Sequence, residues 1–192
     1  MADFRFETDR LILRDWRTED WPLFWELTNT PAVMRWLGGV ASEETRQSAK
    51  SRVEGYRERF GHTFWVMERK ADGGHLSGEM LGFCGLKRAS VEGSPVFGMM
   101  EVGWRMREDA WGKGYAKEAA IASLELGFSR YGADQIIALT LDDNAASWGL
   151  LRRLGMSRRE DLDYFDGNWP AEFNPNIVYL ITAQEWARRG DG

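Results

Sequence analysis

The chain has 192 residues, of which 43% are apolar and 29% charged, with a formal net charge of −5 at neutral pH. This balance is that of a folded globular protein, and the length suits one compact domain better than two. The negative charge argues against nucleic acid as a partner, because nucleic-acid-binding surfaces are usually basic.

The first third of the chain predicts one strand and two helices. Residues 11–16 form a short apolar stretch with a polar side, which is typical of a strand. Thr18 is expected to cap a helix that runs to Asn29, because acidic residues follow it and apolar residues then recur at helical spacing. A second, more polar helix is expected over residues 42–60.

The middle of the chain changes from a helical to a strand pattern. Turn-rich segments separate three expected strands, at residues 62–69, 80–87 and 96–107. The connections between them are short, which favours antiparallel neighbours.

The last part of the chain predicts a parallel unit followed by mixed elements. Small and apolar residues recur every four positions in a helix expected over residues 116–131, and a strand is expected over 135–141. The strand before this helix and the strand after it should form a right-handed parallel pair. The remaining expected elements are a helix at 145–154, strands at 156–164 and 176–182, and a helix at 183–188.

These elements together predict an α+β fold. We expect a mixed, mostly antiparallel sheet of about six or seven strands, flanked by helices, in a single domain over residues 1–192. Cys84 is the one cysteine, which excludes a disulfide within the chain, and no apolar run reaches the ~18 residues that cross a membrane. We therefore expect a cytoplasmic protein that does not interact with membranes. His62 and His75 are expected at the surface, without a catalytic role.

The most informative segment, residues 111–116, joins a strand to a helix and contains Gly112 and Gly114. Glycine lets the backbone approach a ligand closely, and the first N–H groups of a helix lack internal acceptors. The helix dipole also favours a negative charge there, so a phosphate fits, and Lys113 adds positive charge. Gly-x-Gly before a helix is also typical of a plain loop. The spacing excludes a Walker loop, and the third glycine of a dinucleotide fingerprint is missing.

This segment resembles the acyl-CoA-binding motif of the GNAT N-acetyltransferases. With Lys117-Glu118-Ala119 after it, the segment is similar to the ribosomal-protein N-acetyltransferase (RimJ/RimL-like) branch. The further matching segments are residues 8–14 with 18–20, 31–37 and 144–156. The resemblance covers a core of about residues 7–187. It implies an acyl-CoA N-acyltransferase fold whose parallel strands splay apart, with acetyl-CoA as acyl donor and no metal.

The resemblance also implies two walls for the acyl donor. Backbone groups of Met106 and Arg107 are expected to bond the pantetheine amides, and amides of residues 112–116 to hold the pyrophosphate. Asn144 and Ser147 are expected to line the opposite wall, and the position of Asn144 also predicts a helix N-cap. The expected cofactor-binding residues are Met106, Arg107, Trp111, Gly112, Lys113, Gly114, Tyr115, Ala116, Asn144 and Ser147.

The implied reaction is attack of a neutral amine on a thioester carbonyl, which requires a group that removes a proton. Glu101 is the candidate base; the alternative interpretation is a solvated strand glutamate or a salt-bridge partner of an arginine. A backbone N–H near Arg105 is the candidate donor to the carbonyl oxygen. Many relatives carry a tyrosine as general acid where this chain has Leu151. Ser147 is therefore the candidate donor to the thiolate, unless the thiolate leaves unaided.

The resemblance thus predicts an acetyltransferase that moves an acetyl group from acetyl-CoA to a primary amine, by direct attack in a ternary complex. The acceptor is a protein N-terminus, an amino acid or a small metabolite. A non-catalytic acyl-CoA sensor or scaffold is the alternative, and a phosphate-binding domain for another nucleotide is a third hypothesis. Relatives often form dimers, so the resemblance also allows a homodimer.

Overall fold

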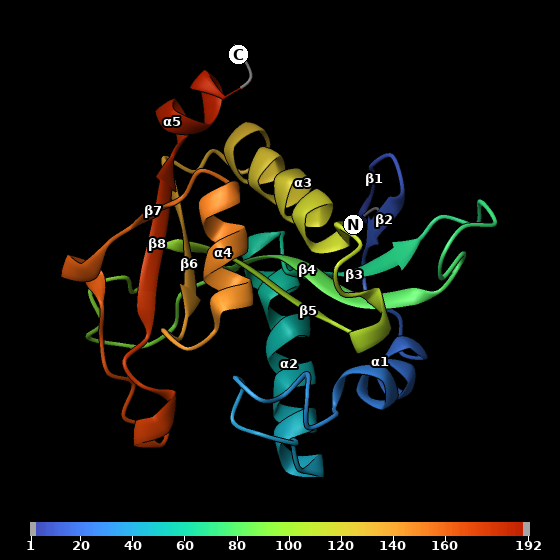
Figure 1. Cartoon of the computed structure of the whole chain (residues 1–192), viewed down its shortest axis with the longest axis horizontal. Coiled ribbons are helices and arrows are strands. Elements are labelled where there is room, and N and C mark those ends of the chain that lie inside the picture. Colours follow the sequence, from blue (N-terminus) through green and yellow to red (C-terminus); the bar gives the residue numbers. More distant parts are fainter. Residues whose placement is uncertain (1–2, 190–192) are drawn as a thin grey trace.

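The computed structural model describes residues 3–189, which form one mixed sheet with helices on both faces (Figure 1). The eight strands of the described chain lie in the order β1-β2-β3-β4-β5-β6-β8-β7, and all neighbours are antiparallel except β5 and β6. They are β1 (Arg5–Glu7), β2 (Leu11–Arg14), β3 (Phe64–Arg69), β4 (Met80–Arg88), β5 (Met100–Met106), β6 (Gln135–Thr140), β7 (Ser157–Arg158) and β8 (Ile177–Thr182). The predicted α+β class and the parallel pair are confirmed.

The helices follow the predicted order. They are α1 (Asp20–Thr28), α2 (Glu43–Phe60), α3 (Tyr115–Ser129), α4 (Ala145–Arg153) and α5 (Ala183–Arg188). Ser42 caps α2 by accepting a hydrogen bond from the Thr45 amide at 3.2 Å. The predicted cap of α1 at Thr18 is wrong, because the helix begins at Asp20. The N-cap residue is Glu19, whose side chain makes no capping bond, and the carboxylate of Asp20 accepts the Arg17 amide at 2.7 Å in the turn before the helix.

The sheet differs from the sequence prediction at its edges. Strand β1 was not predicted, since three residues are too few to show an alternating pattern. Strand β7 has only two residues instead of the predicted 156–164, because Asp163 turns back to pair with the Arg158 guanidinium. Strand β5 begins later than predicted, because Gly98 forms a turn at φ +78° just before it.

The two faces of the sheet have separate apolar cores, and residues along one strand alternate between them. On β3, Trp65 and Met67 pack in the core beneath α3, whereas Phe64 and Val66 pack with residues of α1 and α2. A third cluster contains Ile137 of β6, with residues of β8. Helix α3 therefore covers one face, and α1 with α2 covers part of the other.

The parallel strands separate soon after they begin. Only Met100 pairs with Ile136 and Glu101 with Ile137; beyond this point β6 pairs with β8 alone, while β5 stays paired with β4 as far as Met106. The edge of β5 that faces β6 is thus open over residues 102–106, roughly 17 Å at 3.3 Å per residue. No helix within residues 3–189 is long and apolar enough to span a membrane.

Candidate active site

The open edge of β5 presents backbone groups to the gap between β5 and β6. The Arg107 amide donates to the Leu81 carbonyl at 2.9 Å, so residue 107 faces β4, and the alternation of the ladder turns Trp104 and Met106 toward the gap. The Arg107 carbonyl accepts the Ala110 amide at 3.2 Å, so both backbone groups of Arg107 are engaged within the protein. Of the two residues expected to bond a pantetheine, only Met106 faces the gap, and its carbonyl accepts the Trp111 indole N–H at 3.1 Å.

A glycine bend leads from the end of β5 into α3. Gly112 and Gly114 have φ values of +71° and +82°, which a residue with a side chain adopts only with strain. Within the described chain, no amide from residue 112 to residue 117 donates a hydrogen bond to a protein acceptor. We call residues 112–117 the cradle. A Cβ atom on Gly112 would meet no atom within 4 Å, so the cradle is open on that side.

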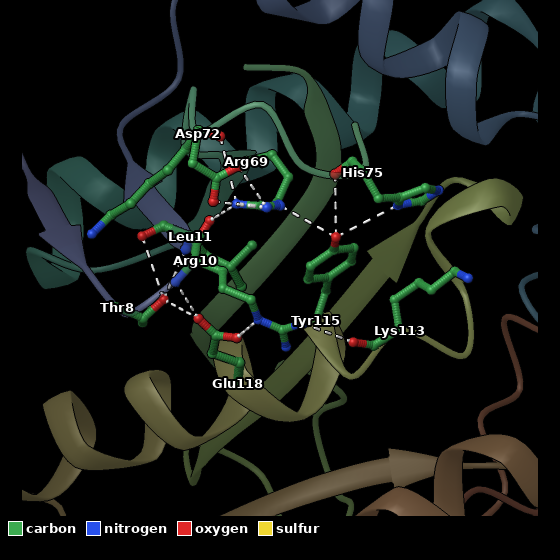
Figure 2. A network of polar contacts seen from close by, with 10 residues as sticks. Thr8, Arg10, Leu11, Arg69, Asp72, His75, Lys113, Tyr115 and Glu118 are labelled. Atoms are coloured by element: carbon green, nitrogen blue, oxygen red, sulfur yellow. Dashed lines mark hydrogen bonds and ion pairs between the residues drawn. The ribbon is translucent and has the colours of Figure 1, made fainter. Parts of the chain in front are cut away.

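Arg10 supports the cradle from below. Its Nη1 donates to the Lys113 carbonyl at 3.0 Å, and its Nε pairs with Glu118 of α3 at 2.7 Å (Figure 2). The same carboxylate accepts the Thr8 hydroxyl at 2.6 Å and the Arg10 amide at 2.8 Å. Burial raises the pKa of Glu118, but these hydrogen bonds and the Arg10 charge outweigh burial and hold that pKa below its usual value. The N-terminal segment thus fixes the entry of α3.

Tyr115 contributes to this support through its side chain. It is only 3% exposed, and Figure 2 shows its ring lying between the chains of Arg10 and Arg69. The two guanidinium carbons lie 4.7 and 5.5 Å from the ring centre, and the Tyr115 hydroxyl donates to the His75 carbonyl at 3.2 Å. Tyr115 therefore offers a ligand its backbone amide alone. The Lys113 ammonium points away from this network in Figure 2.

The start of α4 lies on the β6 side of the gap, because β6 leads into it. The Asn144 side-chain oxygen accepts the Ser147 amide at 3.3 Å, so the predicted N-cap is confirmed. Ser147 is partly buried, and Leu151 is 1% exposed in the core. Ligand contacts at Asn144 and Ser147 stay predictions.

Glu101 lies at the point where β5 and β6 separate. It is 7% exposed, and its carboxylate pairs with the Lys87 ammonium across the β4–β5 ladder at 2.7 Å. Burial lowers the pKa of Lys87, but the Glu101 charge outweighs burial and keeps it above its usual value. Glu101 is therefore a buried ion-pair partner and not a solvated strand residue.

Arg105 lies four residues beyond Glu101 on the same face of β5, with Gly103 between them. We call Lys87, Glu101 and Arg105 the polar strip; it lies on the face that α1 and α2 partly cover. The guanidinium carbon of Arg105 is 5.5 to 5.6 Å from the ring centres of Phe24, Trp25 and Phe83. The side chain of Arg105 could not be predicted as a site residue, because the sequence of an alternating strand does not show what surrounds an arginine in it.

The two histidines have different surroundings. His75 is exposed, as predicted, but His62 is 2% exposed and its Nδ1 lies 3.1 Å from the Leu86 carbonyl, so its predicted surface position is wrong. Burial lowers the pKa of His62 and favours a neutral ring. No group of three potential metal-ligating side chains forms within residues 3–189.

Comparison with known proteins places this geometry among acetyltransferases. A family model described as an acetyltransferase (GNAT) domain matches residues 10–157. The N-acetyltransferase YnaD of Bacillus subtilis is 31% identical over 93% of this chain and 97% of its own length. YkkB of the same organism is also 31% identical, over 81% of this chain and 86% of its own.

Solved structures share the fold. An acetyltransferase from Agrobacterium tumefaciens has a TM-score of 0.78 at 21% identity, covering 94% of this chain and 95% of its own. A GNAT-family acetyltransferase from Bacillus anthracis has a TM-score of 0.73 at 24% identity, covering 94% and 99%. At these identities the likeness concerns the fold.

Proposed function

Because this chain belongs to the GNAT acetyltransferase family, we propose that it moves an acetyl group from acetyl-CoA to a primary amine by direct attack in a ternary complex. The enzyme class, an acetyl-CoA-dependent N-acetyltransferase, follows from the family. The observation that carries the proposal is a run of unbonded amides beside an open strand edge. The proposal includes a single domain over residues 1–192 that is similar to the RimJ/RimL-like branch. It also includes a cytoplasmic location and a reaction that needs no metal.

The residues present fit acetyl-CoA. The cradle amides stand at the positive end of the α3 dipole with no protein acceptor, and they match a diphosphate in charge and in hydrogen bonding. The gap between β5 and β6 runs from the cradle to Glu101, and its β5 wall carries the backbone groups of Trp104 and Met106. An extended chain of amides can bond to such an edge as a strand would.

Bound acetyl-CoA supplies an acetyl thioester, which the acceptor amine attacks as a sulfur leaving group departs. Glu101 is the proposed base: its carboxylate, which lies 2.7 Å from the Lys87 ammonium, accepts the proton of the amine, directly or through a water. The Trp104 amide, next to Arg105, is the proposed donor to the carbonyl oxygen, because Arg105 itself faces β4. Ser147 is the proposed donor to the sulfur, since Leu151 has no proton to give.

The proposal is tested by thiol release from acetyl-CoA with a panel of amines and peptides, with products identified by mass spectrometry. Turnover of any amine supports an enzyme. Binding of acetyl-CoA without release on any amine would favour the sensor or scaffold. Thermal stabilisation by ATP or NAD equal to that by acetyl-CoA would favour another nucleotide, because only CoA also carries the arm that fits the gap.

A further inference from the structure

Arg105 is a partly buried cation without an anionic partner. Its Nε and Nη1 atoms are buried and bonded to nothing, and no carboxylate in residues 3–189 forms an ion pair with it. An unmet buried donor is destabilising, and native proteins rarely keep one without a reason. Burial, and then the charge of Arg52, lower the pKa of Arg105 to about 10, so the group still carries its proton at neutral pH.

The charges around Arg105 do not balance within this part of the molecule. The neighbouring Glu101 is already paired with Lys87 at 2.7 Å. On α1, the Asp20 carboxylate pairs with the Arg14 guanidinium at 2.7 Å, and on α2, Glu54 lies 4.0 Å from Lys50. Arg52 of α2 is close enough to Arg105 to lower its pKa, and it too has no ion-pair partner in the described chain. The strip therefore has an excess of positive charge that the chain leaves unmatched.

Arg105 is also fixed in place. A Cβ atom on Gly82 of β4 would lie 2.0 Å from the Arg105 carbonyl oxygen, so only glycine allows the two strands to approach as they do. The rings of Phe24, Trp25 and Phe83 surround the guanidinium and exclude much of the water. A guanidinium held in this way binds a carboxylate more strongly than an exposed one does.

The strip places this cation on the side of the gap where the proposed base lies. Glu101 and Arg105 are separated by four positions of β5, roughly 13 Å along the strand at 3.3 Å per residue. Both side chains project from the same face, because they are an even number of residues apart. An acceptor whose amine reaches Glu101 thus has Arg105 within reach of its other end.

We propose that the acceptor of this enzyme carries a carboxylate in addition to its amine, and that Arg105, assisted by Arg52, binds this carboxylate. This inference rests on the proposed function and narrows it to aminocarboxylates. The aromatic rings around Arg105 favour an apolar side chain beside the carboxylate of the acceptor. A free amino acid and a peptide with a carboxylate end share this chemistry.

The experiment compares matched pairs of amines in the thiol-release assay. Phenylalanine and leucine are paired with their amides, and a short peptide with a free C-terminus is paired with its amidated form. The amide of an amino acid has an amine like that of a peptide, with a pKa of about 8, so a larger fraction of it is deprotonated at neutral pH. A preference for the acid cannot then come from the amine. We expect kcat/KM for the acid to exceed that for the amide by about 10- to 100-fold, mostly through KM.

Two variants assign that preference to Arg105. Arg105→Met removes the charge and keeps an unbranched apolar side chain among the rings, so the protein should fold at least as stably as the wild type. Its kcat/KM for the acid should fall by about 10- to 100-fold, while that for the amide stays within about twofold. Arg59→Met is the matched control, because Arg59 also lies over a ring, that of Phe60, but belongs to the last turn of α2. It should change neither value.

The outcomes separate the inference from the proposed function. If acetyl-CoA binds and no amine of either kind releases thiol, the proposed function fails and this inference fails with it. If amines are acetylated but amides serve as well as acids, or if Arg105→Met keeps the preference for acids, the function stands and this inference is overturned. Preference for the free amino acid over the peptide, or the reverse, identifies the source of the carboxylate.

Discussion

The cradle and the polar strip differ in which of their polar groups lack a hydrogen-bond partner. Beneath the cradle, the charged side chains that support it are paired: Arg10 with Glu118, and Arg69 with Asp72 at 2.9 Å. What stays unbonded there is backbone, the amides of residues 112–117. On the polar strip the backbone is paired in the sheet, and what stays unbonded is the side chain of Arg105.

This difference suits the two regions to different tasks, the cradle to binding the acyl donor and the strip to selecting the acceptor. Backbone donors are the same whatever the residue, so a cradle built from them tolerates sequence change except where glycine is required. A donor molecule that all members of a family share can be bound in this way. Side chains change with a single substitution, so unmatched side chains are suited to selecting an acceptor. The largest effects on acetyl-CoA binding should therefore come from the cradle and the largest effects on amine turnover from the strip.

The most severe test of this division is Gly114→Glu. The substitution places bulk and negative charge at the cradle, and a Cβ atom there would lie 3.3 Å from Arg10 Nη2. We expect affinity for acetyl-CoA, measured by calorimetry, to fall by about 1,000-fold, or about 4 kcal/mol. The left-handed backbone at φ +82° also costs about 1–2 kcal/mol in folding stability.

Gly132→Glu separates these two effects. Gly132 has φ +63° and open space around a Cβ atom, but it follows α3 at the end remote from the cradle. This control should lose similar stability and keep its affinity for acetyl-CoA. Undiminished affinity in Gly114→Glu would remove the cradle from the proposal.

Glu101→Gln tests the strip. We expect kcat to fall by about 100-fold with acetyl-CoA affinity unchanged, because the amide cannot accept a proton. The change also leaves the partly buried Lys87 without its partner, which should reduce the free energy of unfolding by about 3 kcal/mol.

The double variant Glu101→Gln with Lys87→Met distinguishes a catalytic from a structural role. It removes the uncompensated charge, so the stability should largely return while the turnover stays low. Recovery of turnover along with stability would mean that Glu101 acts only as a partner for Lys87.

The cradle could be predicted from the sequence because its chemistry depends on local order. Two glycines one residue apart, placed between a strand and a helix, determine the bend at Gly112 and Gly114 and the direction of its amides. The parallel pair and the cap at Asn144 were predictable for the same reason. The resemblance added the splay of the strands, which no local pattern indicates.

The surroundings of the strip could not be predicted, because they depend on contacts distant in sequence. The rings around Arg105 come from α1 and β4, and the partner of Glu101 comes from β4 through the register of the ladder. Arg10 reaches Glu118 across 108 positions. The sequence of an alternating strand does not show what covers a polar residue. His62, just before β3, is likewise buried through a contact distant in sequence, that of its ring with the Leu86 carbonyl.

A smaller effect, on folding stability, is expected at Glu118, which holds Arg10 against the cradle. Glu118→Gln removes the charge that Arg10 and Thr8 contact, and it should lower the free energy of unfolding at pH 7 by about 1–2 kcal/mol, since solvent partly screens the group. Because the folded-state pKa of Glu118 is lowered, its contribution is present above the unfolded value near 4.5 and is lost as pH falls through the folded value. Denaturant unfolding at pH 7 and pH 3 should show the wild type and the variant converging in acid.

Glu125→Gln is the control for that experiment. Glu125 lies on the same helix but accepts only the Trp186 indole at 2.9 Å, near the far end of α3. It should leave acetyl-CoA affinity unchanged, whereas Glu118→Gln should weaken it a few-fold by loosening the Lys113 carbonyl. Equal affinities in the two variants would mean that the cradle keeps its shape without Arg10.

The smallest effect is expected at Asn144, where a structural and a ligand role coincide. Asn144→Ala removes the cap of α4 and should cost about 1 kcal/mol in stability, whereas Asn144→Asp keeps an oxygen in the capping position and should cost almost nothing. If Asn144 also lines the wall for acetyl-CoA, the aspartate variant should still lose affinity a few-fold, because its charge faces a donor that is itself anionic. A calorimetric titration that finds wild-type affinity in Asn144→Asp would reduce Asn144 to a cap. The side of the gap formed by α4 would then act through Ser147 or through the backbone.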